Sequence, residues 1–161
     1  MYSTTSQGGA NLNCSGGCGT IYSITTGGVF TSLYDFCALS SCLDGYYSGD
    51  GPLFQETNGT FYDTNAYGGT DNVGTVFTWS EGLPAFVTPS PAAGAVGSRV
   101  TILGNSLSGA TSVSFNGTPA TFTASNHAIR TTVPAGATTG TITVTLATST
   151  LTSKINFTVM P

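Results

Sequence analysis

The sequence has few charged residues and no helical pattern. Only 6% of its 161 residues are charged, far below the roughly one quarter that is usual for a soluble domain. No long stretch places apolar residues at the i, i+3, i+4 spacing of an amphipathic helix. Glycine is plentiful, with 22 residues, and aromatic residues make up 11% of the chain. Short strands and tight turns suit this composition, so we predict an all-β protein.

Basic residues are nearly absent, and the charges are unevenly placed. The chain carries three basic and seven acidic residues, for a formal net charge of −4. The bases Arg99, Arg130 and Lys154 all lie in the second half, whereas the acids all lie in the first half. Three scattered bases cannot neutralise a run of phosphates, so we expect no nucleic-acid partner. The change from negative to positive charge along the chain predicts a boundary near residue 82, between a segment at 1–82 and a domain at 83–161.

The chain also lacks the segments that cross or target membranes. No apolar run approaches the roughly 20 residues that span a bilayer. At the N-terminus, no basic segment followed by an apolar core marks a signal peptide. Four cysteines in two close pairs, with a single lysine, are nevertheless typical of an extracellular or cell-surface protein. We therefore expect a mature or truncated piece of a longer secreted protein, without a membrane span.

The first half repeats itself. The stretch YSTTSQGG at residues 2–9 recurs as YDTNAYGG at 62–69, and GTIYSI at 19–24 recurs as GTVFTW at 74–79. The interval between the two stretches is longer in the first copy, where it contains two of the cysteines. A period of this size, with several strands and a glycine-rich turn at each end, indicates a propeller-blade-like β-repeat. We count one full repeat and part of a second.

A set of short motifs covers about residues 2–80 of this half. They run from Y-x-T-T-x-x-G-G and G-T-[IV]-[YF] through L-Y-x-F-C and C-x-D-G to N-G-x-F-Y-x-T. The set resembles the GloVer tandem repeat of large secreted proteins of environmental bacteria. The chain departs from that family in having few copies, and in having Asp63-Thr64-Asn65 where Gly-Thr-Thr is usual. The resemblance implies an extracellular all-β repeat, with further repeats in the parent chain, and no catalytic residue.

The second half is organised around one predicted hairpin. Val113 and Phe115 alternate with serines, Asn116-Gly117 follows, and Ala120 and Phe122 then alternate with threonines on a return strand. Asn-Gly is the strongest short hairpin signal, because both residues accept the positive φ of a type I′ turn. Roughly seven strands with turns every 8–12 residues predict an immunoglobulin-like β-sandwich. Its predicted core contains Val100, Ile102, Val113, Phe115, Phe122, Ile129, Ile142, Val144, Ile155 and Phe157.

Four further motifs run through this half almost from end to end. They are PSPAAG at 89–94, GSRVTILGN at 97–105, ATSVSFNGT at 110–118 and VPAGATTGTITV at 133–144. Together they resemble the IPT/TIG domain, over about residues 84–160. Such domains occur in bacterial surface proteins, receptor ectodomains, starch-acting enzymes and some DNA-binding proteins. The resemblance therefore implies a fold without choosing a function.

No group of residues has the pattern of a catalytic or metal site. His127 is the single histidine, and we interpret it as an exposed residue at the start of a strand. Asp44, Asp50 and Asp71 lie near glycines but lack the D-x-[DN]-x-[DN]-G spacing of a calcium loop, so ordinary turns explain them better. No nucleophile–base pair or carboxylate dyad is visible. We predict that the chain is not an enzyme and has no catalytic residue, metal or cofactor.

Four aromatic residues are candidates for binding a ligand. Tyr46, Tyr47, Tyr67 and Trp79 have rings on which sugars stack, so a polysaccharide is a possible partner. Trp79 has an alternative interpretation, because it takes the place of Ile24 in the repeat. Equivalent positions of a repeat usually share their burial, so Trp79 is better explained as a residue of a core or interface strand.

The four cysteines are expected to form two short-range disulfides, Cys14–Cys18 and Cys37–Cys42. Each pair brackets glycine or serine residues that let the chain turn back to the Cα separation that a disulfide needs. A cross-pairing or a four-thiolate metal site remains open, because the spacings C-x₃-C and C-x₄-C are near those of zinc ligands.

Taken together, these patterns predict a structural or adhesive module of a bacterial surface or matrix protein. One full repeat and part of another cannot close a propeller, since repeat architectures normally need about three units to bury a continuous core. We therefore expect the chain to self-associate into an oligomer or filament by strand addition, unless further repeats of a parent chain cover its edges. The alternative function is a carbohydrate-binding accessory region of a secreted hydrolase.

Overall fold

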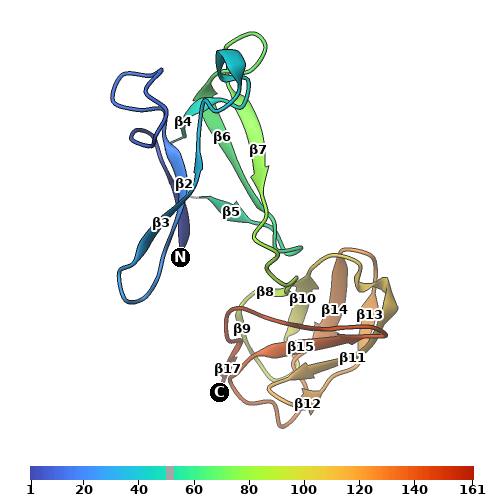
Figure 1. Cartoon of the computed structure of the whole chain (residues 1–161). Coiled ribbons are helices and arrows are strands. Elements are labelled where there is room, and N and C mark those ends of the chain that lie inside the picture. Colours follow the sequence, from blue (N-terminus) through green and yellow to red (C-terminus); the bar gives the residue numbers. More distant parts are fainter. Residues whose placement is uncertain (50–52) are drawn as a thin grey trace. The chain divides into compact units, whose positions relative to one another are not determined.

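The computed structural model of the protein describes residues 1–49 and 53–161 (Figure 1), so Asp50 lies outside the described residues. The described residues form strands, loops and two 3₁₀ turns at Ser40–Cys42 and Leu107–Gly109, and the predicted all-β class is confirmed. Within these ranges, no helix has the length and apolar character needed to cross a membrane. The chain divides into a first unit, Met1–Glu56 with Thr60–Glu81, and a second unit, Thr57–Gly59 with Gly82–Pro161. That the ranges 1–82 and 83–161 fold separately stays a prediction.

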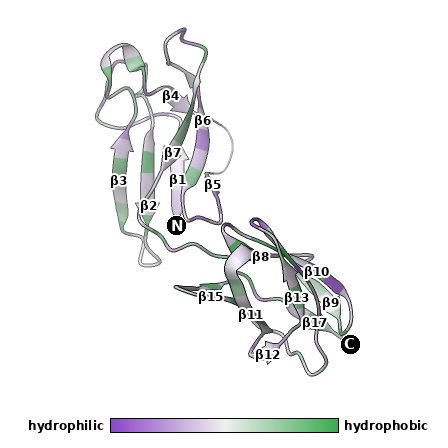
Figure 2. Cartoon of the chain, turned by 90° about the vertical axis from the view of Figure 1, so that its right-hand side faces the viewer, coloured by the Kyte–Doolittle hydropathy of each residue, from purple (hydrophilic) through white to green (hydrophobic). Residues whose placement is uncertain are grey.

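The first unit contains an antiparallel sheet of three strands. These strands are β1 (Tyr2–Thr5), β2 (Thr20–Ile24) and β3 (Phe30–Asp35), with β2 in the centre. Figure 2 shows apolar bands separated by more polar residues along β2 and β3. Both faces of the sheet carry apolar groups, because Ile21 is buried on one face and the rings of Tyr22 and Phe30 stack on the other.

A second sheet of the first unit is built around one long strand, β6 (Phe61–Tyr67). On one side β6 pairs with β4 (Tyr46–Ser48) and β5 (Phe54–Gln55), and on the other side it pairs with β7 (Thr75–Trp79). Every pairing is antiparallel.

Aromatic rings hold the two sheets of the first unit face to face. The ring of Tyr2 lies 5.0 Å from that of Phe61, and the ring of Phe36 lies 4.9 Å from that of Phe77, measured between centroids. Such pairs contribute about 0.5–1.5 kcal/mol each beyond the area that they bury. The packing explains how a small unit with few aliphatic residues keeps a core.

The two copies of the sequence repeat form equivalent hairpins. Hairpin β1–β2 pairs Thr4 with Ile21, and hairpin β6–β7 pairs Thr64 with Val76 in the equivalent register. One glycine opens the second strand of each hairpin, Gly19 with φ +95° and Gly74 with φ +99°. A Cβ atom on either glycine would collide with a backbone carbonyl oxygen of the preceding strand. Both copies therefore need glycine at this place.

The two hairpins differ in their strand neighbours. In the second sheet β5 pairs with the outer edge of β6, whereas within residues 1–49 and 53–161 the equivalent edge of β1 has no strand neighbour. In the first sheet β3 pairs with β2, whereas β7, the equivalent of β2, pairs with β6 alone among the described residues. The two sheets together thus show four antiparallel strand positions for one repeat, the number in a propeller blade. That each copy of the repeat is a propeller blade stays a prediction.

The second unit is a sandwich of two antiparallel sheets of four strands. One sheet has the order β13 (Phe122–Ala124), β14 (Ala128–Thr132), β10 (Arg99–Leu103) and β8 (Thr88–Ser90). The other has the order β12 (Thr118–Pro119), β11 (Ala110–Phe115), β15 (Ile142–Leu146) and β16 (Thr150–Thr152). Strands β9 (Ala93–Ala95) and β17 (Thr158–Met160) form a separate parallel pair.

The predicted hairpin at Asn116-Gly117 is confirmed, but its return strand is shorter than predicted. Asn116 and Gly117 have φ values of +45° and +86°, and Phe115 pairs with Thr118 across the turn. The chain then leaves this sheet, and Phe122 pairs with Thr131 in the opposite sheet. The prediction that Phe122 continues the return strand was wrong, whereas Ala120 still donates its N–H to the Val113 carbonyl at 2.9 Å. The Thr131 hydroxyl donates a 2.7 Å hydrogen bond to the Thr121 carbonyl and anchors the chain at the opposite sheet.

The core of the sandwich contains eight of the ten predicted residues. Phe122 is only half-buried, and the prediction for Ile155 was wrong, because its side chain is 48% exposed. The alternation is broken by Ser153, whose buried hydroxyl accepts from the Ile142 N–H and donates to the Ile155 carbonyl. Sequence reasoning missed the buried residues Val87, Leu107, Val133, Ala137 and Leu151.

Candidate functional site

Three of the four candidate aromatic residues meet in one hollow of the first unit. Tyr46 and Tyr67 stack with centroids 5.4 Å apart and planes at 22°, and Tyr47 lies edge-on to both. The hollow has a volume of about 500 Å³ and is also lined by Asn13 and Asn72. Stacked rings beside amide groups suit the apolar face and the hydroxyl groups of a sugar. The role of these tyrosines as ligand-binding residues stays a prediction.

The backbone around this tyrosine hollow is unusual. Ser41, Cys42, Tyr47 and Asn72 line the hollow and have φ values between +50° and +55°. Positive φ is uncommon outside glycine and costs of the order of 1–3 kcal/mol for a residue that is not suited to it. The Tyr47 hydroxyl is held by a 3.0 Å bond to the Ser15 carbonyl, which fixes one wall of the hollow. Such strain gathers at functional sites more often than elsewhere.

Trp79 does not belong to this hollow. Its ring packs 5.9 Å from that of Tyr34, between the two sheets, and its Nε1 donates a 2.8 Å hydrogen bond to Glu81. The hollow at Trp79 has a volume of about 370 Å³ and is lined mainly by apolar residues such as Ile21 and Phe36. This position favours the interpretation of Trp79 as a residue of an interface strand.

Beside Trp79, one tyrosine hydroxyl is tightly held. The Tyr34 hydroxyl donates a 2.8 Å hydrogen bond to Asp44 Oδ2, and the Asp44 carboxylate also accepts from the Ala38 and Leu39 N–H groups. Burial and the bond to Asp44 raise the pKa of Tyr34 to about 12. Asp44 thus caps a turn, in agreement with its predicted role.

This raised pKa predicts a loss of stability at high pH. An unfolded chain releases its tyrosine protons near pH 10, whereas the folded chain holds the Tyr34 proton up to about pH 12. The contribution of Tyr34 is therefore complete below about pH 10 and is lost as the pH rises through about 12. Thermal unfolding followed from pH 8 to 12 should show the stability difference between the wild type and Tyr34→Phe narrowing across this range. A difference that stays constant to pH 12 would contradict the assignment, and Tyr67→Phe, in an exposed tyrosine, is the control.

The cysteines lie next to the tyrosine hollow. Cys14 is joined to Cys18 and Cys37 to Cys42, with Cα separations of 5.0 and 4.1 Å. The two bridges are close neighbours, because the sulfur atoms of Cys14, Cys37 and Cys42 all lie within 4.8 Å of one another. Cross-pairing therefore remains within geometric reach, whereas the group placed like metal ligands has three sulfurs and does not include Cys18.

Peptide mapping without reduction should find the pairs Cys14–Cys18 and Cys37–Cys42. Loops as short as these remove little chain entropy, so each bridge should stabilise the first unit by about 1–3 kcal/mol and chiefly fix the shape of the loop. Four free thiols, a bound metal or a cross-linked pair would each overturn this pairing. Mapping after purification with and without a thiol-alkylating agent separates native bridges from later exchange.

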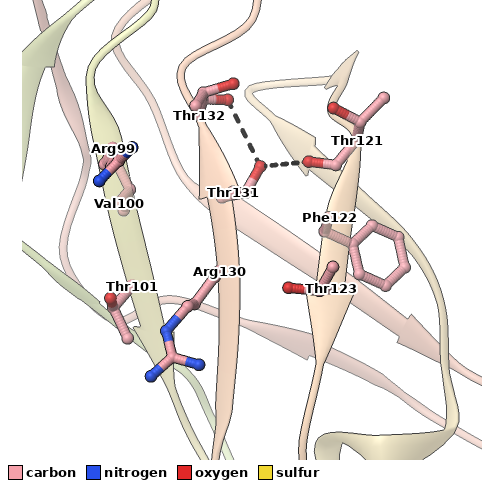
Figure 3. Close-up of a pocket in the computed structure, with 9 residues that line it drawn as sticks. All are labelled: Arg99, Val100, Thr101, Thr121, Phe122, Thr123, Arg130, Thr131 and Thr132. Carbon is pink, nitrogen blue, oxygen red and sulfur yellow. Dashed lines mark hydrogen bonds between the residues drawn. The ribbon is translucent and has the colours of Figure 1, made fainter.

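The arginines lie together on the second unit, although the sequence separates them. Arg99 on β10 and Arg130 on β14 line one hollow of about 540 Å³, with threonines around them (Figure 3). The register of β10 and β14 places the two arginines close together, since Arg130 pairs directly with Thr101, two residues after Arg99. Neither guanidinium has an ion-pair partner in the part of the chain that the structure describes. The hollow suits a carboxylate or sulfate group, which arginine binds through two parallel hydrogen bonds.

His127 is exposed and directly precedes β14, as the sequence predicted. Among the described residues, the single group of side chains placed like metal ligands is the cysteine group above. Sequence reasoning did not single out the arginine hollow, because only the strand register brings its residues together.

Comparison with known proteins identifies the second unit. Residues 84–159 match the family model of the IPT/TIG domain, an immunoglobulin-like and non-catalytic domain family. The match confirms the resemblance of this half, whereas the resemblance of the first half to the GloVer repeat stays a prediction. No curated protein matches the chain.

Proposed function

We propose that this chain is a non-enzymatic structural and adhesive module that acts outside the cell, and that its copies associate by strand addition. The observation that carries the proposal is that, among the described residues, β1 and β7 each have a strand neighbour on one side alone. The disulfides and the IPT/TIG domain, a module of structural and adhesive proteins, support an extracellular location.

The unpaired strand edges are the proposed contact. Within residues 1–49 and 53–161, β1 pairs with β2 alone and β7 with β6 alone, so both carry backbone N–H and C=O groups on an outer edge. Natural proteins usually protect such edges with lysine, proline or a covering loop. The sequence has no lysine in the first unit. An added strand from another chain would satisfy these groups.

Association at these edges would be head-to-tail, because β1 and β7 are different surfaces. A head-to-tail contact closes into a ring if its rotation allows, and otherwise grows into a filament. Either product is suited to a surface layer or a matrix, where one weak contact is multiplied along an assembly.

Light scattering over a range of concentrations, with amide hydrogen exchange, tests this function. We expect a defined oligomer or fibre whose amides in the edge strands β1 and β7 become protected as the concentration rises. A monomer at high concentration, with those amides exchanging freely, would refute self-association. In that case further repeats of a parent chain cover the edges.

The tyrosine hollow supports a second function, binding of polysaccharide as an accessory region of a secreted hydrolase. The stacked pair of Tyr46 and Tyr67 is the specific observation in its favour. Affinity electrophoresis in gels that contain soluble polysaccharides should retard the wild type more than Tyr67→Ala. The control is Val96→Ala, which removes an exposed apolar side chain of the second unit, outside the hollow. Equal migration of all three proteins in every gel would exclude this function.

A further inference from the structure

The two equivalent hairpins of the first unit differ in how their faces are covered. On hairpin β1–β2, the face that bears Ile21 packs against the second sheet, and Ile21 is 1% exposed. On hairpin β6–β7, Val76 holds the equivalent place and is 77% exposed. The neighbouring residues on each face show the same difference in burial. Tyr2 and Thr4 are half-buried, whereas their equivalents Tyr62 and Thr64 are exposed. We call the face of Tyr62, Thr64, Val76 and Thr78 the bare face.

The packing inside the chain shows what covers such a face. The face of hairpin β1–β2 that bears Ile21 packs on the face of hairpin β6–β7 that points away from the bare face. There the ring of Tyr2 meets that of Phe61, and the Thr4 hydroxyl donates a 3.2 Å hydrogen bond to Asp63. Phe77 completes this surface through its contact with Phe36 on the first sheet. Each repeat therefore covers its predecessor with one defined face.

The first hairpin carries the equivalent of this covering face, in which Met1 is 74% exposed and Ser3 and Tyr22 are half-buried. Repeat equivalence assigns Met1, Ser3 and Tyr22 to the places of Phe61, Asp63 and Phe77. The ring of Tyr22 stacks on Phe30 at 5.0 Å between centroids, and Phe30 is 55% exposed. We call this the docking face. Large exposed aromatic groups on a sheet are typical of an interaction surface.

We propose that the bare face of one copy packs on the docking face of a second copy, and so repeats between chains the contact that already exists within each chain. By equivalence, Tyr62 meets Met1 of the next copy, Thr64 meets Ser3 and Val76 meets Tyr22. A second copy fits both surfaces because every chain carries one of each. Neither set of residues includes a charged side chain, so no like-charge repulsion opposes the contact.

The contact goes beyond the proposed function, with which it shares only the premise that copies associate. It uses the faces of the sheets, whereas strand addition uses their edges. If each copy of the repeat is a propeller blade, each chain supplies two blades, and propellers have about four to eight blades. A closed ring therefore contains about two to four copies, and a rotation that does not close gives a filament.

Two matched substitutions in the full chain test the contact. Val76→Glu places a charge on the bare face, and Val73→Glu places the same charge on the nearby loop, where Val73 is 82% exposed. Sedimentation velocity should show an assembled wild type and Val73→Glu, and a Val76→Glu variant that needs at least tenfold higher concentration to assemble. Circular dichroism verifies that each variant is folded. If both variants assemble like the wild type, or if the wild type is a monomer, the face-to-face contact is refuted.

A cross-link provides an independent test and separates the two kinds of contact. In a variant with Ser3→Cys and Thr64→Cys, mild oxidation should join chains into a ladder of covalent multimers. The control, Ser3→Cys with Thr70→Cys, should yield no ladder because Thr70 lies in the loop. A ladder of covalent multimers, together with freely exchanging amides in β1 and β7, would support the face-to-face contact and refute strand addition. If no ladder forms and the amides in β1 and β7 are protected, the face-to-face contact is refuted and strand addition remains.

Discussion

Replacing Phe115 with alanine is expected to lower the free energy of unfolding of the second unit by about 3–5 kcal/mol. Phe115 is 1% exposed, and its ring packs edge-on against Phe157 with centroids 5.1 Å apart. Truncation removes both the buried ring and this contact, and it leaves a cavity between two sheets that cannot close over it. Since a small domain has a total stability of about 5–15 kcal/mol, the variant should be close to unfolding.

Urea unfolding of a fragment of residues 84–160, followed by circular dichroism, measures this loss. The control is Ile155→Ala, because Ile155 is 48% exposed and its removal should cost less than about 1 kcal/mol. Equal costs at the two positions would mean that the core is wrongly assigned. A wild-type fragment that stays unfolded would count against the predicted domain boundary.

In the first unit, we expect Ile21→Ala to cost about 2–5 kcal/mol of stability and Val76→Ala less than about 0.5 kcal/mol. The two residues hold the same place in the two hairpins, yet Ile21 is buried between the sheets and Val76 is exposed. The comparison thus keeps strand position, register and the type of side chain nearly constant and varies only the burial.

Thermal unfolding of the full chain at low concentration gives the comparison, since association would otherwise stabilise the wild type by mass action. A large loss at Val76 under these conditions would mean that something within the monomer covers it. That result would also remove the basis for the bare face.

Local sequence signals predicted the turns and the repeat well. Asn116-Gly117 adopts positive φ because only such residues do so at low cost, and the Gly19 and Gly74 positions match because both meet a carbonyl oxygen. These features depend on a few neighbouring residues, so the sequence alone contains what is needed. The IPT/TIG motifs predicted the second unit for the same reason.

Features that depend on distant contacts were harder to predict. Ile155 continues the alternation of Phe157 and Val159, but the hydrogen bonds of the Ser153 hydroxyl decide which side chain turns inward. Val76 has the sequence of a core residue and is nevertheless 77% exposed.

The residues of the candidate site could be chosen from the sequence, but their arrangement depends on which strands pair. The sequence selected Tyr46, Tyr47 and Tyr67, and the structure brings them together because β4 pairs with β6. The repeat had already favoured an interface strand for Trp79 through its equivalence to Ile24, and its ring packs against that of Tyr34. The meeting of Arg99 and Arg130 also follows only from the register of β10 and β14.

The parallel pairing of β9 with β17 has a mechanical consequence. Thr158 pairs with Ala93 and Met160 with Ala95, so the two strands run in the same direction. A pull on the two ends of the second unit drags β9 backward and β17 forward, along their common axis. The hydrogen bonds of the pair then bear the load together in shear, whereas a hairpin pulled at its open end loses them one at a time. A domain built in this way resists unfolding by a force applied along its two ends.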